Sequence, residues 1–234
     1  MAIARSKSQV VFWEEAGVVS TTNSPFCRLK PIPIRAVRMQ EGFWKPRMDK
    51  NATVTLKSQM QKLRETGVLD NFLRLYDKSD AGFQGRPSSD SDLYKWVEAA
   101  SWTLQTYKLP EIEKMLNDAI EIIEPAQDDD GYLNTYHQIG GVSWRWTDLD
   151  RGFELYCAGH LFQAAVAHHR STGDDRLLKM ACKFADHICE VFGPGKREGH
   201  PGHPGIEMAL IELYRETGVK KPAISRYFFT PVSR

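Results

Sequence analysis

The sequence of 234 residues predicts an all-α protein built from repeated helical hairpins. Apolar residues recur at helical spacing through most of the chain after residue 51, and glycine or proline ends most of these periodic segments. Residues 163–173 are similar to residues 208–218 at an offset of 45, and 98–115 are similar to 163–180 at an offset of 65. Repeated hairpins at such periods are typical of a solenoid or a closed α/α toroid, because each hairpin buries its apolar face against its neighbours.

Composition and charge exclude several classes of protein. Hydrophobic residues make up 41% and charged residues 26%, as in soluble globular domains. The net charge is +1 and no basic stripe is present, so we expect no nucleic-acid partner. There is no secretory signal and no apolar run near the ~18 residues of a membrane span. We therefore expect a cytoplasmic protein without a membrane partner.

The N-terminal part shows no helical period. Residues 1–25 are expected to be disordered or poorly packed. Residues 26–44 form a short extended segment, because Pro31 and Pro33 forbid a helix there. Ile32, Ile34 and Val37 suggest a short strand within it.

Turn and cap residues place the helices that follow. Gly67 is a C-cap candidate, Asp90 or Ser91 can cap a later helix at its N-terminus, and Pro110 suits a first turn. The expected helices are 51–66, 68–77, 90–104, 110–124, 154–169, 175–192 and 206–216. Residues 126–152 are expected to form a loop, and loops of that length are uncommon and usually functional.

Five strings of sequence carry a family resemblance. They are EGFWKPR at 41–47, DSDLYKWVE at 90–98, DGYLNTY at 130–136, ELYCAGH at 154–160 and FGPGKREGHPGHP at 192–204. Their order and spacing resemble the front half of the β-L-arabinofuranosidase catalytic domain, glycoside hydrolase family 127. The resemblance covers roughly residues 26–218.

The resemblance implies a fold and a mechanism. The family has an (α/α)6 barrel, so we expect an incomplete (α/α)6 barrel over 26–221 and a tail outside the family at 222–234. Family members are retaining enzymes that use a zinc-bound cysteine thiolate as nucleophile and a glutamate as acid/base. The Glu-x-Cys and Cys-Cys motifs that carry this chemistry do not occur in the 234 residues.

We therefore expect a carbohydrate substrate but no catalytic residue, metal site or cofactor in this chain, although a full-length member would hold zinc. The chain alone is expected to be inactive. Cys182, His187 and Cys189 lie on one helix at a spacing that does not gather three zinc ligands. An open barrel edge at helices 175–192 and 206–216 also predicts self-association.

Six residues are predicted to bind the sugar, because polar groups at two helix starts lie beside an aromatic loop. They are His203, Glu154, Tyr132, Trp146, Asp92 and His160. Each has a structural alternative: a helix-dipole acid for Glu154, a buried histidine for His160, a cap for Asp92, and core anchors for the aromatic residues. In the family, the positions of Phe153 and Gly205 are usually histidine and glutamate.

Two other functions stay open from the sequence. The chain could be a non-catalytic helical module that binds carbohydrate or serves as a scaffold. It could also be another α/α toroid enzyme, such as a sugar epimerase or an unsaturated-uronide hydrolase.

Overall fold

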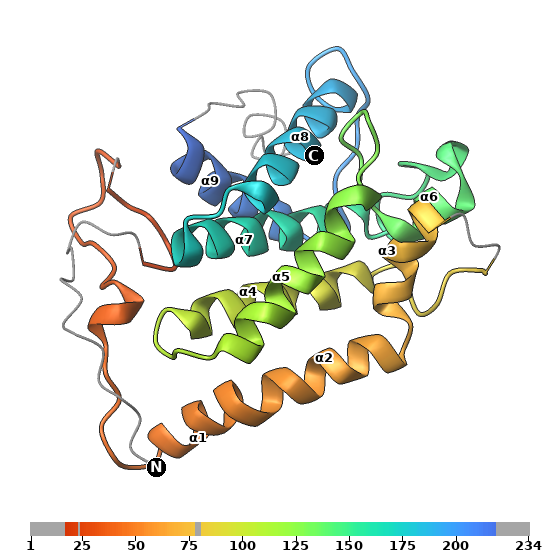
Figure 1. Ribbon diagram of the computed structural model, residues 1–234. Coiled ribbons are helices and arrows are strands. Elements are labelled where there is room, and N and C mark those ends of the chain that lie inside the picture. The colour runs from red at the N-terminus through yellow and green to blue at the C-terminus, as the bar shows by residue number, and fades with distance from the viewer. Residues whose placement is uncertain (1–16, 23, 78–80, 219–234) are drawn as a thin grey trace.

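The computed structural model describes residues 17–22, 24–77 and 81–218, which form a helical assembly (Figure 1). The helices are α1 (Lys45–Lys50), α2 (Leu56–Glu65), α3 (Val68–Asp77), α4 (Asp90–Leu104), α5 (Pro110–Ile123), α6 (Thr135–Gly140), α7 (Glu154–Thr172), α8 (Arg176–Val191) and α9 (Gly205–Thr217). Short turns are η1 (Ile34–Ala36), η2 (Asn51–Thr55), η3 (Glu124–Ala126) and η4 (Val142–Trp144). No strand occurs among the described residues, and the all-α prediction is confirmed.

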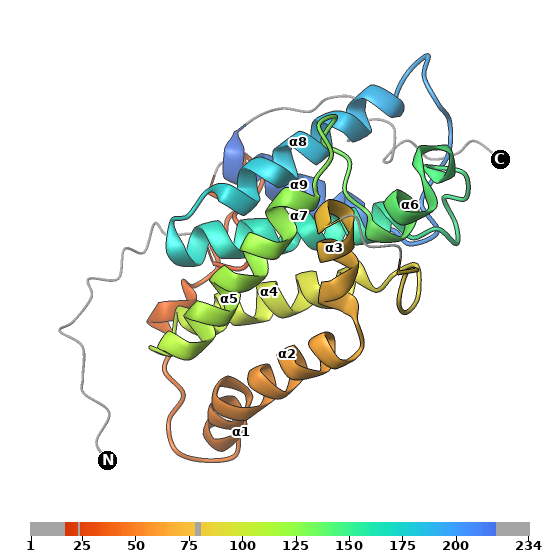
Figure 2. The same cartoon turned by 45° about the vertical axis from the view of Figure 1, so that its right-hand side comes forward.

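Helices α4, α7 and α9 lie side by side and run in the same direction. Near their N-termini, the Cys157 thiol on α7 contacts the Pro87 carbonyl just before α4. At the other end, the Gln105 amide after α4 donates to the Arg170 carbonyl on α7. Helix α7 has its most extensive contacts with α4 and α9. These three helices therefore form one parallel layer, and their N-termini meet at the α6 end of the molecule (Figures 1 and 2).

Helices α5 and α8 return antiparallel to that layer and complete two α/α hairpins, α4–α5 and α7–α8. Gln127, just after α5, donates to the Met180 carbonyl on α8 at 3.0 Å, which ties the two return helices together. The buried core runs between the two layers and includes Leu161, Phe162 and Phe184. This arrangement is part of an α/α barrel.

Gly159 sets how closely α7 and α9 approach. A Cβ atom at this position would lie 3.1 Å from the Ile206 Cα, tighter than ordinary van der Waals contact. The absence of a side chain therefore lets the first turn of α9 rest directly on α7. That contact brings the loop before α9 to the N-terminal end of α7.

The N-terminal segment differs from the prediction. The described part of 26–44 contains no strand, because the chain makes the 3-10 turn η1 directly after Pro33. Residues 17–22 are joined to the helices by hydrogen bonds: Arg170 donates to the Gly17 and Val18 carbonyls, and the Ser20 N–H donates to Glu212. Residues 1–16 of the predicted disordered segment lie outside the described residues.

The first helix also begins earlier than predicted. It starts at Lys45 rather than at residue 51, with Pro46 in the first turn, where the missing N–H costs nothing. The π-helical turn η2 then joins α1 to α2 without a break.

The expected loop at 126–152 is partly helical. It contains η3, α6 and η4, which are each too short to show a helical period in the sequence. Asp90 does not cap α4 as predicted; its carboxylate instead accepts from the backbone N–H (2.7 Å) and the hydroxyl of Thr135 at the start of α6. Burial raises the pKa of Asp90 to about 6, although the bonds from Thr135 oppose this shift.

Exposed apolar residues lie on α9 rather than on α8. Met208 and Tyr214 are exposed on α9, whereas the described part of α8 exposes no large hydrophobic side chain. Self-association through α9 stays a prediction. Among the described residues, no helix is both long and apolar enough to cross a membrane.

Candidate functional site

Tyr156 is the centre of a group of side chains at the N-terminal end of the parallel layer. It lies in the first turn of α7, and its ring centroid is 4.6 Å from that of His160, one turn later. The centroid of His203, in the loop before α9, is 5.1 Å from the same ring. Two of the predicted sugar-binding residues, His160 and His203, are therefore brought to one ring.

Helix α4 adds charged groups to the same place. The Lys95 Nζ atom lies 5.2 Å from the centroid of the Tyr156 ring. Lys95 also pairs with Asp92, the third predicted residue, at 3.5 Å. Asp92 faces Arg86 as well, at 3.7 Å. The N-terminal parts of α4 and α7 and the loop before α9 thus meet around Tyr156.

The electrostatics keep His160 neutral. Burial lowers the pKa of His160 to about 4, and the nearby Lys95 and His203 lower it further, while Asp92 opposes the shift. At neutral pH His160 therefore carries one N–H donor and one acceptor nitrogen. The Nδ1 atom of exposed His203 accepts from the Gly205 N–H at 3.1 Å, so its Nε2 atom is left to donate outward.

Two more residues border this group. Burial raises the pKa of Glu207, in the first turn of α9, and the neighbouring His203 opposes that shift. Phe153 lies at the N-cap of α7 with φ 57°, a left-handed conformation that bulky residues rarely adopt. Its ring meets Tyr156 edge-on, with centroids 5.8 Å apart. Phe153 therefore places an apolar ring, partly exposed, at the edge of the site.

The other three predicted residues form a buried cluster behind this group. Glu154 and Tyr132 are fully buried, and the Tyr132 hydroxyl donates a short hydrogen bond to the Glu154 carboxylate. The same carboxylate accepts the backbone N–H of Trp146 at 2.8 and 2.9 Å. Burial raises the pKa of Glu154, and the bond from Tyr132 opposes the shift. In this structure the Glu154 carboxylate, the Tyr132 hydroxyl and the Trp146 backbone N–H bind one another, while the Trp146 Nε1 atom is buried without a hydrogen-bond partner. Binding of sugar by these three residues stays a prediction.

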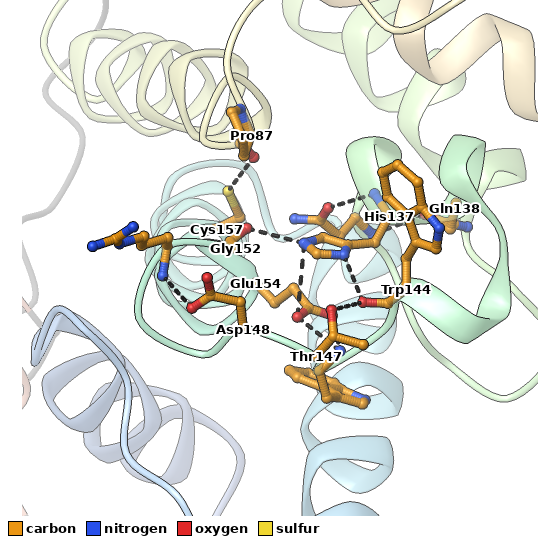
Figure 3. Close-up of polar contacts among 12 residues, drawn as sticks. Pro87, His137, Gln138, Trp144, Thr147, Asp148, Gly152, Glu154 and Cys157 are labelled. Carbon is orange, nitrogen blue, oxygen red and sulfur yellow. Dashed lines mark hydrogen bonds and ion pairs between the residues drawn. The ribbon is translucent and has the colours of Figure 1, made fainter.

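His137 completes the buried cluster. Its ring nitrogens lie 2.9 Å from the Trp144 carbonyl and 3.2 Å from the Gly152 carbonyl (Figure 3). Its Nε2 atom is also 3.7 Å from the Glu154 carboxylate. His137 and Glu154 therefore hold both ends of the loop that leads into α7.

That loop in turn supports the histidine loop before α9. The Gly202 N–H donates to the Leu149 carbonyl at 3.2 Å. A Cβ atom at Gly202 would lie 2.4 Å from the Asp150 carbonyl, so only glycine allows this approach. The buried cluster thus holds the loop before α7, and that loop in turn holds the loop that carries His203.

Cys157 lies near the N-terminus of α7. Cys157 is fully buried, and burial raises the pKa of its thiol, with the nearby Asp90 adding to the shift. A raised thiol pKa disfavours the thiolate, which is the form that acts as a nucleophile or metal ligand. The described residues contain no group of three or more His, Cys, Asp or Glu placed to hold a metal ion. The residues described here do not fit a zinc site.

Four residues found here are not among the six predicted to bind sugar: Tyr156, Lys95, Glu207 and His137. Two of them had a usable signal. Tyr156 and His160 are spaced i, i+4, and Asp92 and Lys95 are spaced i, i+3, so each pair shares a helix face. Nothing in the sequence pointed to His137, because its role depends on carbonyl groups of a loop that is irregular.

A parallel layer of helices with return helices, and a polar site at the N-termini of that layer, define an α/α-barrel protein. Residues 36–230 match the family described as β-L-arabinofuranosidase, GH127 catalytic domain. The chain belongs to this family. The match runs past residue 221, where we expected the family resemblance to end, although residues 219–234 lie outside the described part.

Individual relatives agree with this assignment. The chain is 41% identical over 148 residues to the non-reducing end β-L-arabinofuranosidase of Bifidobacterium longum subsp. longum, covering 61% of this chain and 22% of that enzyme. A solved GH127 β-L-arabinofuranosidase from Geobacillus stearothermophilus T6 is 41% identical with a TM-score of 0.78, covering 82% of this chain and 32% of that one. A second GH127 β-arabinofuranosidase structure is 35% identical with a TM-score of 0.76.

A relative with a different activity is more distant. The cellobiose 2-epimerase of Bacteroides fragilis is 26% identical over 162 residues, which cover 62% of this chain and 39% of that enzyme. The two GH127 relatives described first are much longer than this chain, which spans 22% and 32% of their lengths. The chain corresponds to part of a GH127 β-L-arabinofuranosidase-like protein.

Proposed function

We propose that this chain provides a sugar-binding wall for a β-L-arabinofuranoside at the group around Tyr156. The observation that carries the proposal is the meeting of His160, His203 and Lys95 at this one ring, from three neighbouring segments of a GH127 domain. The family assignment supports the arabinofuranoside as the ligand.

The chemistry of the group suits a ligand with many hydroxyls. Each sugar hydroxyl both donates and accepts hydrogen bonds, and neutral His160 offers one nitrogen of each kind. Lys95 adds three donors and Asp92 adds acceptor oxygens. His203 is exposed and directs its free nitrogen away from its own backbone, so it is free to reach a ligand.

We infer that these residues bind the sugar without cleaving its glycosidic bond. A retaining mechanism requires both a nucleophile and an acid/base. In the resemblance, both belong to Glu-x-Cys and Cys-Cys motifs, which the 234 residues do not contain. We therefore expect zinc binding and the retaining reaction only in polypeptides that contain those motifs.

The test combines binding and turnover in the purified 234-residue chain. We expect methyl β-L-arabinofuranoside to bind in calorimetry, and an aryl β-L-arabinofuranoside to stay uncleaved. The variant His203→Ala should weaken binding about tenfold, since one hydrogen bond contributes roughly 1–1.5 kcal/mol. His200→Ala is the matched control, because His200 is exposed in the same loop but makes no contact with Tyr156.

Turnover by the chain that disappears in Glu154→Gln or Cys157→Ser would show that the catalytic centre has been misplaced. Equal binding by the His203→Ala and wild-type chains would remove His203 from the site.

A sugar epimerase is the second candidate, supported by the likeness to the cellobiose 2-epimerase. Epimerisation needs a base that removes a proton from the sugar. His160, near the N-terminus of α7 and beside Tyr156, is the candidate for this base. Its pKa of about 4 makes it a weak base, however, which favours the binding role. Conversion of cellobiose to its 2-epimer by the chain, followed by NMR, would favour the epimerase instead.

A further inference from the structure

The described part of the barrel is open at both ends of its inner layer. Helices α4, α7 and α9 form that layer in this order, and α2, α5 and α8 lie outside it (Figures 1 and 2). Helix α2 runs antiparallel to α4, as α5 does, so it is the third outer helix (Figure 1). The described residues therefore provide three inner and three outer helices. One open edge is α9, and the other is α4 with α2 beside it.

Helix α9 carries an apolar stripe on its outward side. The stripe consists of Met208, Ile211 and Tyr214, which recur along the helix at i, i+3 and i+6. Met208 is 61% exposed, Tyr214 is 42% exposed and Ile211 is half-buried. The other side of α9 packs on α7 at Gly159. An exposed apolar stripe on the last described helix is a surface that a partner can cover.

The opposite edge is a groove of about 470 Å³ between α2 and α4. Its apolar lining includes Leu63 from α2, and Trp96 and Ala99 from α4. The Trp96 ring is held in place because its Nε1 atom donates to the Leu56 carbonyl at 2.8 Å. The groove therefore offers a fixed apolar base along the side of α4 that faces away from α7.

Charge also relates the two edges. Lys62 and Lys95 both line the groove, against one carboxylate, that of Asp92. Glu207 lies in the first turn of α9, and its Oε2 atom has no hydrogen-bond partner among the described residues. Because α4 and α9 are parallel, a second copy of α9 laid along α4 brings Glu207 level with the N-terminal half of α4, which contains Lys95. The acidic start of α9 thus meets the basic end of the groove.

A two-fold rotation covers both edges of two copies at once. An axis parallel to the inner helices keeps these helices parallel and carries α9 of each chain to α4 of the other. Each contact then occurs twice, as in the two-fold dimers that are the commonest soluble oligomers. Two copies together provide six inner and six outer helices, the number in an (α/α)6 barrel. The net charge of +1 on each chain gives little repulsion between the copies.

We propose that two copies of this chain close into one barrel, in which α9 of each copy occupies the groove between α2 and α4 of the other. This inference concerns assembly and does not depend on sugar binding. The groups around Tyr156 from both copies then lie at the same end of the closed barrel, because all six inner helices are parallel.

Analytical ultracentrifugation of the purified 234-residue chain tests the assembly directly. We expect a species with twice the 26.7 kDa mass of one chain, and no larger species, because a closed barrel leaves no open edge. A single-chain mass at every concentration would overturn the proposal and leave both edges to a different polypeptide. A series of ever larger species would also overturn it, since the edges would then join without closing.

Variants at the two edges test which surfaces pair. Tyr214→Asp places a charge in the apolar stripe, and Ser58→Trp fills the groove with a ring. Each should raise the dissociation constant of the dimer at least about hundredfold, because the change occurs in both contacts and an unpaired charge or an overfilled groove opposes packing. Met208→Asp, at the more exposed end of the stripe, should act in the same way.

Two matched controls should stay dimeric. Val142→Asp adds the same charge at an apolar side chain that is 72% exposed on η4, which is not an edge helix. Arg64→Trp adds the same ring to α2 at an exposed residue that does not line the groove. Circular dichroism should show the same helix content in all variants. Dimers of Ser58→Trp as stable as those of the wild type would show that α9 does not occupy the groove, and would overturn the proposal.

A mixture of two variants gives the sharpest result. A dimer of one Tyr214→Asp chain and one Ser58→Trp chain keeps one intact contact, between the unchanged α9 of the second chain and the unchanged groove of the first. Mixed dimers should therefore form at lower concentrations than dimers of either variant alone. Mixed dimers no more stable than these would contradict the pairing of α9 with the groove.

Discussion

Replacing Glu154 by alanine is expected to reduce the free energy of unfolding by about 3–5 kcal/mol. The change removes the acceptor for the Tyr132 hydroxyl and for the Trp146 N–H, both of which are buried. A buried donor left without an acceptor costs about 1–3 kcal/mol, and the lost side chain leaves a cavity as well. Urea denaturation, followed by circular dichroism, measures the difference.

Glu154→Gln should recover part of this loss, because its amide oxygen can still accept the Trp146 N–H and its NH₂ group can donate to the Tyr132 hydroxyl. Glu111→Ala is the control, since the Glu111 side chain is 60% exposed in its ion pair with Lys57. Such surface pairs contribute at most about 1 kcal/mol. A Glu154→Ala chain as stable as the Glu111→Ala chain would contradict the buried-cluster interpretation.

Replacing Arg170 by alanine is expected to cost about 3 kcal/mol, because it removes the buried guanidinium between two glutamates. Glu212 then keeps only Arg215 as an ion-pair partner, and Glu216 keeps only His169. The Arg170 Nε atom donates to Glu216 at 2.6 Å and Nη1 to Glu212 at 3.2 Å, with only 4% of the side chain exposed. The same guanidinium binds the Gly17 and Val18 carbonyls. The variant should therefore also release the N-terminal segment.

Two measurements check this expectation. Urea denaturation should show the loss of stability, and limited proteolysis should cut faster around residues 17–20. Lys179→Ala is the matched control, because Lys179 and Asp175 are 73% and 52% exposed. Stability of the Arg170 variant within about 1 kcal/mol of wild type would mean that this network contributes no more than a surface pair.

The hairpins were predictable because their periodic apolar faces are long. The bounds of α3 and α4 agree with the expected 68–77 and 90–104, and Pro110 begins α5 as expected. The start at Lys45 was missed because an exposed first turn carries little apolar pattern. Helix α6 was missed because six residues are too few for a period, and its position depends on the distant carboxylate of Asp90.

The site was only partly predictable for a different reason. Sequence spacing places Tyr156 and His160 on one helix face, and the repeat places the His203 loop at the same end. The sequence does not show whether a polar side chain already has a hydrogen-bond partner inside the protein. Glu154, Tyr132 and Trp146 have the residue types of a sugar site, yet in the fold they bind one another.

The most direct test of the account is the NMR spectrum of the histidine rings during titration with methyl β-L-arabinofuranoside. If the wall around Tyr156 binds the sugar, the ring signals of His160 and His203 shift, and those of His137 and His168 do not, since these two are 3% and 1% exposed. In the free chain, His160 should titrate near pH 4, well below the ordinary pKa of about 6.5. Shifts confined to other histidines, or unchanged signals of His160 and His203 at saturating ligand, would contradict the account.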